Sequence, residues 1–155
     1  MSYNTGYEVS VRLQEIDTVE YHQDIVVIDA GLLFPGNDMP GVELGVPDTT
    51  YLEKNQDRVK AILITHGHED HIGAAAFLLR EFPVPVFCTR LTRGLLQNKL
   101  KEHKLLDDIE IQVVECGQVV NIGSFAVEFF SVSHSIPDSA GMIINTPIGA
   151  VVHTG

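Results

Sequence analysis

The chain has 155 residues, of which 45% are hydrophobic and 20% charged, and its formal net charge at pH 7 is −11. This balance predicts one folded domain and excludes a disordered tail, and no apolar stretch approaches the roughly 20 residues that a membrane-spanning helix needs. We therefore expect a cytoplasmic protein without a membrane partner. The acidic charge argues against nucleic-acid binding by this chain alone, because phosphate contacts rest on Lys and Arg side chains.

Extended segments dominate the chain. They are enriched in β-branched and aromatic residues, which is typical of strands. In chain order, the expected strands lie at residues 7–13, 18–23, 24–31, 61–67, 84–88, 109–115, 124–134, 142–146 and 149–155. The stretch 32–57 is rich in Gly, Pro and Asp and too long for a plain hairpin turn. It is either a functional loop or a surface crossover.

Two helical patterns interrupt the strands. The first covers about 71–82 and ends at Pro83, and the second covers about 90–103, with Thr89 as its expected N-cap. One apolar stripe on the second helix is typical of a core face, and consists of Leu91, Leu95, Leu96 and Leu100. The order of strands and helices predicts a layered α/β or α+β sandwich.

Residues 65–71 read THGHEDH and follow directly on the apolar run AILI. Positions two apart in an extended chain face the same way, so His66 and His68 can bind one metal ion. Asp70 and His71 lie where the chain turns into the expected helix and can reach a second ion. Zinc suits imidazole and carboxylate ligands. The alternative is a solvated His/Asp turn without a metal.

The run THGHEDHIG resembles the signature of the metallo-β-lactamase superfamily, a His-x-His-x-Asp-His run at the end of a strand. Other stretches are similar to the ribonuclease J family in the β-CASP nuclease branch of that superfamily, namely IVVIDAGLLFP, VPDTTYL, LLQNKLKEH, HSIPDSAG and VVHTG. The similarity runs from about Asp24 to Gly155. It implies the N-terminal portion of an αββα sandwich of the mixed α/β (α+β) class, so residues 1–155 are expected to form a partial metallo-β-lactamase domain.

The resemblance implies a site for two zinc ions. Its implied ligands are His66, His68 and His134 for one ion and Asp70 and His71 for the other. The last two are also the expected catalytic residues. Asp29 matches a strand-end aspartate that braces the histidine loop and fixes the orientation of an imidazole; read without the family, it is an acid in the turn before Gly31. The histidines not expected to be ligands are His22, His103 and His153.

The chain departs from the family pattern in two places. The family has a glycine-rich first hairpin that lines the site, whereas here no glycine stands between Gly6 and Gly31, and Gln14 and Asp17 occupy positions of small residues. The sequence ends at Gly155, one residue before the aspartate that bridges the metals in the family. The β-CASP domain and a later histidine ligand lie outside it. We therefore expect a truncated chain that is nearly inactive by itself.

The implied function is that of a zinc-dependent ribonuclease in RNA processing and decay. By the resemblance, it cleaves single-stranded RNA both from the 5′ end and internally, through two-metal hydrolysis. Its expected partners are RNA and either further copies of itself or a paralogue. Two alternatives stay open. One is a hydrolase of the same fold that acts on a thioester, lactone or β-lactam, and the other is a non-catalytic paralogue or partner subunit.

Overall fold

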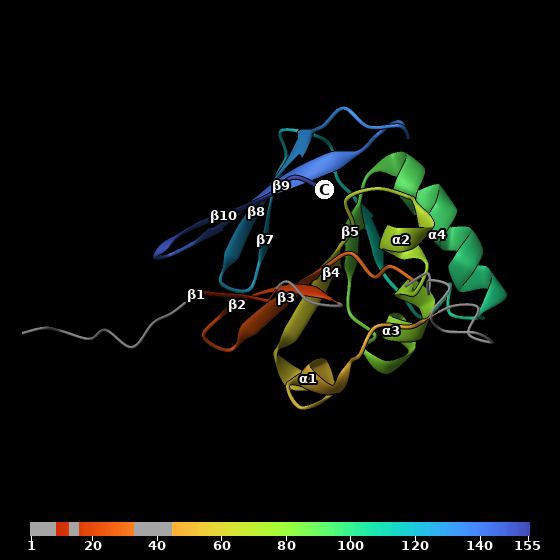
Figure 1. Cartoon of the computed structure of the whole chain (residues 1–155), viewed down its shortest axis with the longest axis horizontal. Helices are drawn as coiled ribbons and strands as arrows, with labels where there is room; N and C mark the ends of the chain where they lie inside the picture. Colours follow the sequence, from red (N-terminus) through yellow and green to blue (C-terminus); the bar gives the residue numbers. More distant parts are fainter. Residues whose placement is uncertain (1–8, 13–15, 33–44) are drawn as a thin grey trace, which may run out of the picture.

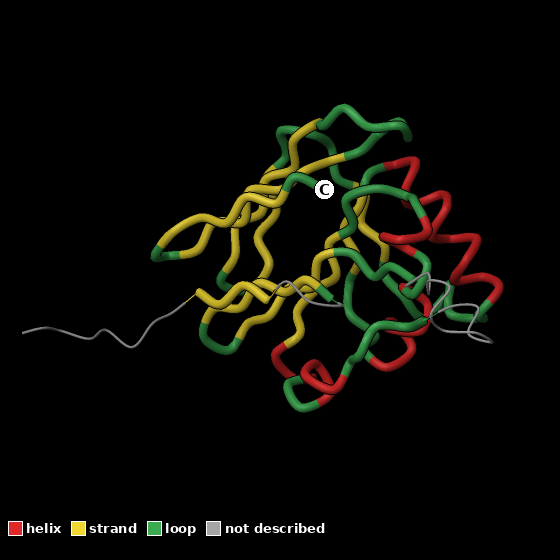
Figure 2. The backbone as a smooth tube through the Cα atoms, viewed as in Figure 1, coloured by secondary structure: helices red, strands yellow, loops and turns green. Residues whose placement is uncertain are grey.

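The computed structural model describes residues 9–12, 16–32 and 45–155 (Figure 1). Within these residues two β-sheets face each other, and the helices lie on the outer side of the larger sheet (Figure 2). Helix, sheet and sheet therefore form three layers. The mixed α/β sandwich expected from the sequence is confirmed.

The larger sheet has six strands in the order β1-β2-β3-β4-β5-β6. The first three strands pair antiparallel, whereas β3 to β6 run parallel. Its strands are β1 (Val9–Arg12), β2 (Asp17–Tyr21), β3 (Asp24–Ile28), β4 (Val59–Leu63), β5 (Val86–Cys88) and β6 (Ile111–Val113). Parallel neighbours end at the same edge of a sheet, so the segments after β3 and β4 meet there.

The smaller sheet is antiparallel and has the order β10-β9-β8-β7. Its strands are β7 (Val119–Ile122), β8 (Phe125–Ser131), β9 (Ala140–Thr146) and β10 (Gly149–His153). The helices are α1 (Thr50–Glu53), the short 3-10 helix η1 (Gln56–Arg58), α2 (Glu69–Ile72), α3 (Ala75–Glu81) and α4 (Arg90–Glu102). None of the described helices has the length and apolar character needed to cross a membrane.

Strand β3 shows how alternate residues build two separate cores. Ile25 and Val27 pack toward the helices, in a cluster that includes Leu96 and Leu100 of α4. Val26 and Ile28, one position along, pack toward the smaller sheet, in a cluster with Phe125, Val127, Phe129, Met142 and Ile144. Because successive side chains of a strand point to opposite faces, one apolar run serves both layers. Strand β3 is thus buried on both faces.

The helix expected at 71–82 is interrupted. It forms α2 and α3, which are separated at Gly73 and Ala74. The amide of Ala74 donates to the carbonyl of Ala30, 2.8 Å away, and not to a carbonyl of its own helix. This bond fastens the segment after β3 to the start of the helical region. A tertiary contact therefore breaks a pattern that is continuous in the sequence.

Other expectations need correction as well. Strand β7 was not expected from the sequence, and the stretch 32–57 contains α1 and η1, while its residues 33–44 lie outside the described part. Thr89 occupies the N-cap position of α4, but its side chain makes no capping bond. The carboxylate of Asp138 accepts the Leu91 amide instead, at 2.9 Å. Leu91 itself is exposed and does not belong to the core.

Candidate metal centre

The metal-ligand candidates gather where β3 and β4 end. Asp29 follows β3 with a left-handed backbone, φ 59°, and its amide donates to the carbonyl of Leu63 at the end of β4, 2.8 Å away. Its carboxylate then accepts bonds from the backbone and the hydroxyl of Thr65, both at 2.8 Å. Asp29, which follows β3, therefore fixes the position of Thr65, where the histidine run after β4 begins.

Three histidines converge on one point. Nδ1 of His68 lies 3.1 Å from Nε2 of His66 and 3.2 Å from Nε2 of His134. One ring nitrogen from each residue can be chosen so that all three lie within 4.8 Å of one another. These are the three residues that the family resemblance implies as ligands of one ion. His134 reaches the other two from the segment after β8, in the opposite sheet.

The geometry of this cluster fits a metal ion better than hydrogen bonds. An imidazole nitrogen carries either one hydrogen or one lone pair, so Nδ1 of His68 cannot form two linear hydrogen bonds at once. Nitrogens bound to a tetrahedral zinc at 2.0–2.1 Å lie roughly 3.3 Å apart. The two short separations observed are close to this value. The three nitrogens lie within 4.8 Å of one another, which is close enough for them to share one cation.

Thr65 sets the orientation of the His66 ring. The Thr65 hydroxyl donates to Asp29 and lies 2.9 Å from Nδ1 of His66, which can donate to it. With the hydrogen on Nδ1, the lone pair of His66 is on Nε2, the atom that faces the cluster. Thr65 was not singled out from the sequence. The only feature of the sequence that could have indicated its role is its position between a buried strand and His66.

Asp70 and His71 lie beside this cluster but do not complete a second one. Nδ1 of His71 is 2.7 Å from Oδ2 of Asp29, so its Nε2 is left to face the site, 3.7 Å from Oδ2 of Asp70. The Asp70 carboxylate is exposed. In residues 9–12, 16–32 and 45–155, the histidine cluster is the only group of three candidate ligands that meets at one point. The structure thus places Asp70 beside His71, and the Asp29 carboxylate contacts the other ring nitrogen of His71.

The segment that carries His134 is anchored on both sides. Its far end returns to the first sheet, where the amide of Ala140 donates to the carbonyl of Thr65 at 3.0 Å. Asp138, with φ 65°, accepts from the start of α4. The Ser139 hydroxyl donates to the carbonyl of Ile136 and closes the turn. The bonds made by the run HSIPDS therefore hold His134 in place. The sequence had suggested no separate role for Asp138 and Ser139.

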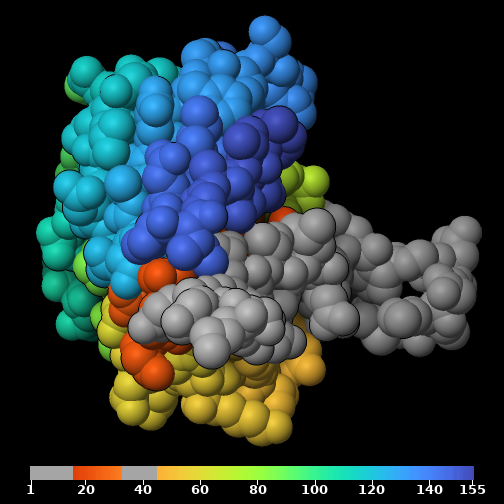
Figure 3. All heavy atoms as spheres, turned by 90° about the vertical axis from the view of Figure 1, so that its left-hand side faces the viewer, coloured from red at the N-terminus to blue at the C-terminus, as the bar shows by residue number. Residues whose placement is uncertain are grey.

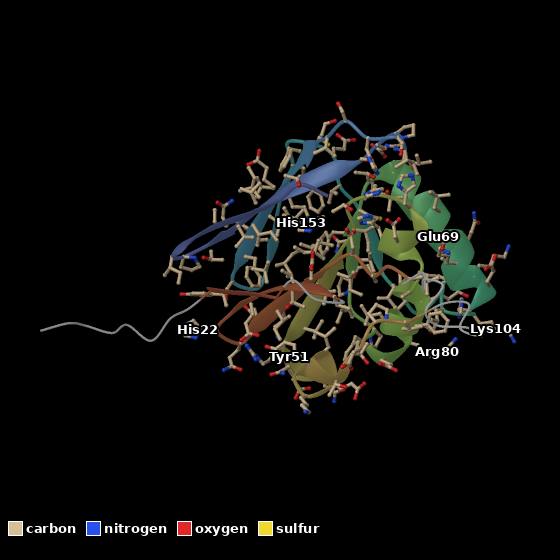
Figure 4. All side chains as sticks on the ribbon, in the orientation of Figure 1. His22, Tyr51, Glu69, Arg80, Lys104 and His153 are labelled. Carbon is tan, nitrogen blue, oxygen red and sulfur yellow. The ribbon has the colours of Figure 1, made fainter. Side chains whose placement is uncertain are left out.

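The three histidines that were not expected to be ligands lie outside the cluster of His66, His68 and His134. Glu69 stands between His68 and Asp70 in the chain and so marks the position of the histidine run. Figure 4 shows His22 and Glu69 on opposite sides of the molecule. His103 follows α4 and contacts Arg80. His153 is at the end of β10, where its Nε2 lies 3.2 Å from Oδ2 of Asp17. None of these three belongs to the described cluster.

Two hollows adjoin the cluster. A cavity of about 120 Å³ is lined by His66, His71, His134 and the 132–133 and 154–155 segments. A neighbouring cleft of about 350 Å³ is lined by carboxylates and imidazoles together with apolar side chains, and its polar members include Asp17, Asp29, Asp70, His71 and His153. The second hollow lies on the Asp70 side of the site.

Burial and the neighbouring rings keep His66 neutral. Burial lowers the pKa of His66 from 6.5 to about 4, and the positive charge on a protonated His71 acts in the same direction. By contrast, the hydrogen bond to Asp29 raises the pKa of His71 above its ordinary value. A metal ion needs neutral imidazoles. His66 is therefore ready to bind above pH 4, whereas His71 gives up a proton more reluctantly.

These shifts predict how the stability of the metal-free chain depends on pH. The folded chain resists protonation of His66 while the unfolded chain accepts it near pH 6.5, so the free energy of unfolding should fall between pH 6.5 and 4, by up to roughly 3 kcal/mol. Urea unfolding in the presence of a chelator measures this. The fall should largely disappear in His66→Gln. An equal fall in both proteins would contradict the assignment.

Comparison with known proteins places the chain. It matches the metallo-beta-lactamase superfamily over residues 19–155. It is 45% identical over 138 residues to Ribonuclease J of Synechocystis sp., which covers 88% of this chain and 22% of that protein. It is 42% identical over 149 residues to Ribonuclease J of Thermus thermophilus, with 92% and 26% covered, and 42% identical over 137 residues to Ribonuclease J2 of Bacillus subtilis, with 88% and 25% covered. The chain spans about a quarter of the length of these curated relatives.

Solved structures show the same fold at low sequence identity. The MIM-2 metallo-beta-lactamase superposes with a TM-score of 0.63 at 16% identity, over 90% of this chain and 53% of that one. Zinc-bound PqqB from Methylobacterium extorquens superposes with a TM-score of 0.58 at 16% identity, over 93% and 50%. The family match, over residues 19–155, includes β3 to β6 of the larger sheet, the whole smaller sheet and all the candidate ligands. The chain belongs to the metallo-β-lactamase superfamily.

Proposed function

We propose that this chain provides the metal site of a zinc-dependent ribonuclease of the ribonuclease J type, which cleaves single-stranded RNA from the 5′ end and internally. The observation that carries the proposal is 36–45% identity to proteins named ribonuclease J over most of the chain. The converging histidines support it, since one ring nitrogen from each lies within 4.8 Å of the others. The same ligand geometry disfavours a non-catalytic paralogue.

Each polar residue of the site has a role in this proposal. One zinc is held by His66, His68 and His134, and the other by Asp70 and His71. Bound zinc supplies positive charge to the phosphate oxygens and acidifies water. Asp29 accepts the Nδ1 hydrogen of His71 at 2.7 Å and so turns the lone pair on Nε2 toward the ion. Asp29 thereby serves the first ion through Thr65 and the second through His71.

RNA is the proposed substrate despite the acidic chain. A formal net charge of −11 repels a polyanion, so RNA binding depends mainly on basic surface outside these residues. We place the enzyme in the cytoplasm and expect it to assemble with copies of itself or a paralogue. The proposed RNA specificity belongs to the whole protein.

The test is an Asp70→Asn variant of the complete gene product. The change keeps the shape of the side chain but removes the charge that attracts the second ion, so cleavage of a 5′-monophosphorylated single-stranded RNA should fall by roughly 100-fold. RNA binding, measured by filter retention, should survive. Asp107→Asn, another exposed acid but remote from the site in sequence, is the control and should leave cleavage unchanged.

The same assay separates the nuclease from other hydrolases of the fold. Both proteins are also given thioester, lactone and β-lactam substrates. A contrary result is a wild type that fails to cleave RNA but hydrolyses one of these substrates, with that activity lost in Asp70→Asn. This result would support the metal site and overturn the ribonuclease proposal.

A further inference from the structure

Asp17 and His153 join the two sheets at the edge of the proposed metal site. Asp17 is the first residue of β2 in the larger sheet, and His153 is the last residue of β10 in the smaller one. Oδ2 of Asp17 and Nε2 of His153 are 3.2 Å apart. Figure 4 shows His153 between the two sheets, and in Figure 3 the blue to violet atoms of β10 lie directly above the orange atoms of the N-terminal strands. Both side chains line the cleft that also contains Asp70 and His71.

Both ring nitrogens of His153 are engaged. The amide of Gly155 donates to Nδ1 at 3.2 Å, so this nitrogen carries a lone pair. The ring hydrogen is then on Nε2 and is donated to Asp17. No ring atom remains for binding an ion or transferring a proton. The role of His153 must therefore lie in what the two bonds hold, which is the backbone at Gly155.

Gly155 lies close to Thr65, the residue that contacts both Asp29 and His66. A Cβ added to Gly155 would meet the carbonyl oxygen of Ala140 at 3.3 Å and Cβ of Thr65 at 3.4 Å, so only a small gap separates the two residues. The Thr65 hydroxyl bridges Asp29 and His66, at 2.8 and 2.9 Å. Gly155 also lines the cavity that His66 shares with His71 and His134. The segment held by His153 is thus one wall of the metal cavity.

We propose that Asp17 and His153 are positioning residues of the metal centre: their hydrogen bond holds residues 154–155 against Thr65 and thereby keeps the ligand network in its binding geometry. The inference rests on the proposed metal hydrolase and deepens it. The sequence had marked Asp17 as an unusual residue in a position of small ones. The structure gives that carboxylate a partner in the opposite sheet, next to the site.

The test measures the affinity of the chain for Co²⁺ by competition with a chelator, together with the visible absorption of the bound ion. Asp17→Ala and His153→Ala should each weaken binding by about 10-fold and alter the spectrum, because partners that orient metal ligands have effects of this size. The double variant should lose no more than either single one, since both remove the same contact. Asp17→Asn keeps an acceptor oxygen for His153 and should bind within about twofold of wild type.

A second contact between the sheets provides the control. At the other end of β3, the hydroxyl of Ser124 donates to Asp24 at 2.7 Å. Ser124→Ala should lower the stability of the metal-free chain in urea without changing Co²⁺ affinity. Wild-type affinity in Asp17→Ala, equal losses in Asp17→Asn and Asp17→Ala, or an equal loss in Ser124→Ala would each overturn the positioning role.

The wild-type chain supplies a further check, which needs no variant to fold. Imidazole ¹⁵N shifts of metal-free protein should place the ring hydrogen of His153 on Nε2, and the opposite tautomer would overturn the inference. A wild type that binds no Co²⁺ would contradict the proposed metal centre itself, and the positioning role with it. Normal wild-type binding that is insensitive to Asp17→Ala would contradict the positioning role alone.

Discussion

Replacing His66 and His68 together with alanine should abolish zinc binding by this chain. The cluster offers three ring nitrogens, and removing two leaves His134 alone, which cannot hold a tetrahedral ion. The untagged wild-type chain should retain about one zinc after gel filtration, and the double variant essentially none. Metal analysis of the two proteins by mass spectrometry measures the difference.

His103→Ala is the matched control for that experiment. It removes a histidine that lies beyond the end of α4 and outside the cluster. Its zinc content should equal that of wild type. Undiminished zinc in the double variant would show that the ion is bound elsewhere, and the assignment of all three ligands would fail.

Gly31→Ala should disrupt the site without touching any ligand side chain. A Cβ on Gly31 would lie 1.7 Å from the carbonyl oxygen of Asp70, a distance that no relaxation of a side chain can relieve. The two backbones must separate, which breaks the bonds from Ala30 to His71 and from Leu32 to Glu69, now 2.7 and 3.1 Å long. We expect the free energy of unfolding to fall by about 3 kcal/mol or more. Urea denaturation measures it.

Gly94→Ala is a control of opposite sign. Gly94 lies inside α4, and a Cβ there meets nothing within 4 Å. Alanine favours a helix interior over glycine by up to about 1 kcal/mol, so this variant should be slightly more stable than wild type. If Gly31→Ala were as stable as wild type, the close approach of residue 31 to Asp70 would be refuted.

The sequence predicted the parts of this protein that local patterns encode. Runs of apolar, β-branched residues located β3 and β4, and the polar run after β4 predicted that His66 and His68 would meet. Bringing His134 to them required the family resemblance, because 63 residues separate His134 from His71 and no local pattern measures such a distance. The resemblance also found Asp29, whose neighbours alone are equally typical of a turn.

The features that the sequence did not predict depend on contacts between distant segments. The division between α2 and α3 results from the bond between Ala74 and Ala30. Asp138 replaces Thr89 as the group that receives an amide at the start of α4. Asp17 and His153 lie near opposite ends of the sequence, and no local pattern around either residue predicts their contact. Patterns along a chain report faces and turns, whereas these pairs exist only once the sheets have packed.

His66 and His68 follow the larger sheet, whereas His134 follows the smaller one. With the proposed ion bound, a single cation cross-links the two layers. A ligand that binds only the assembled form stabilises it by mass action, and each tenfold rise in free ion above the dissociation constant adds about 1.4 kcal/mol. The concentration of free metal ion would then set the stability of the packing between the two sheets. A shortage of the ion would lower this stability as well as the catalytic activity.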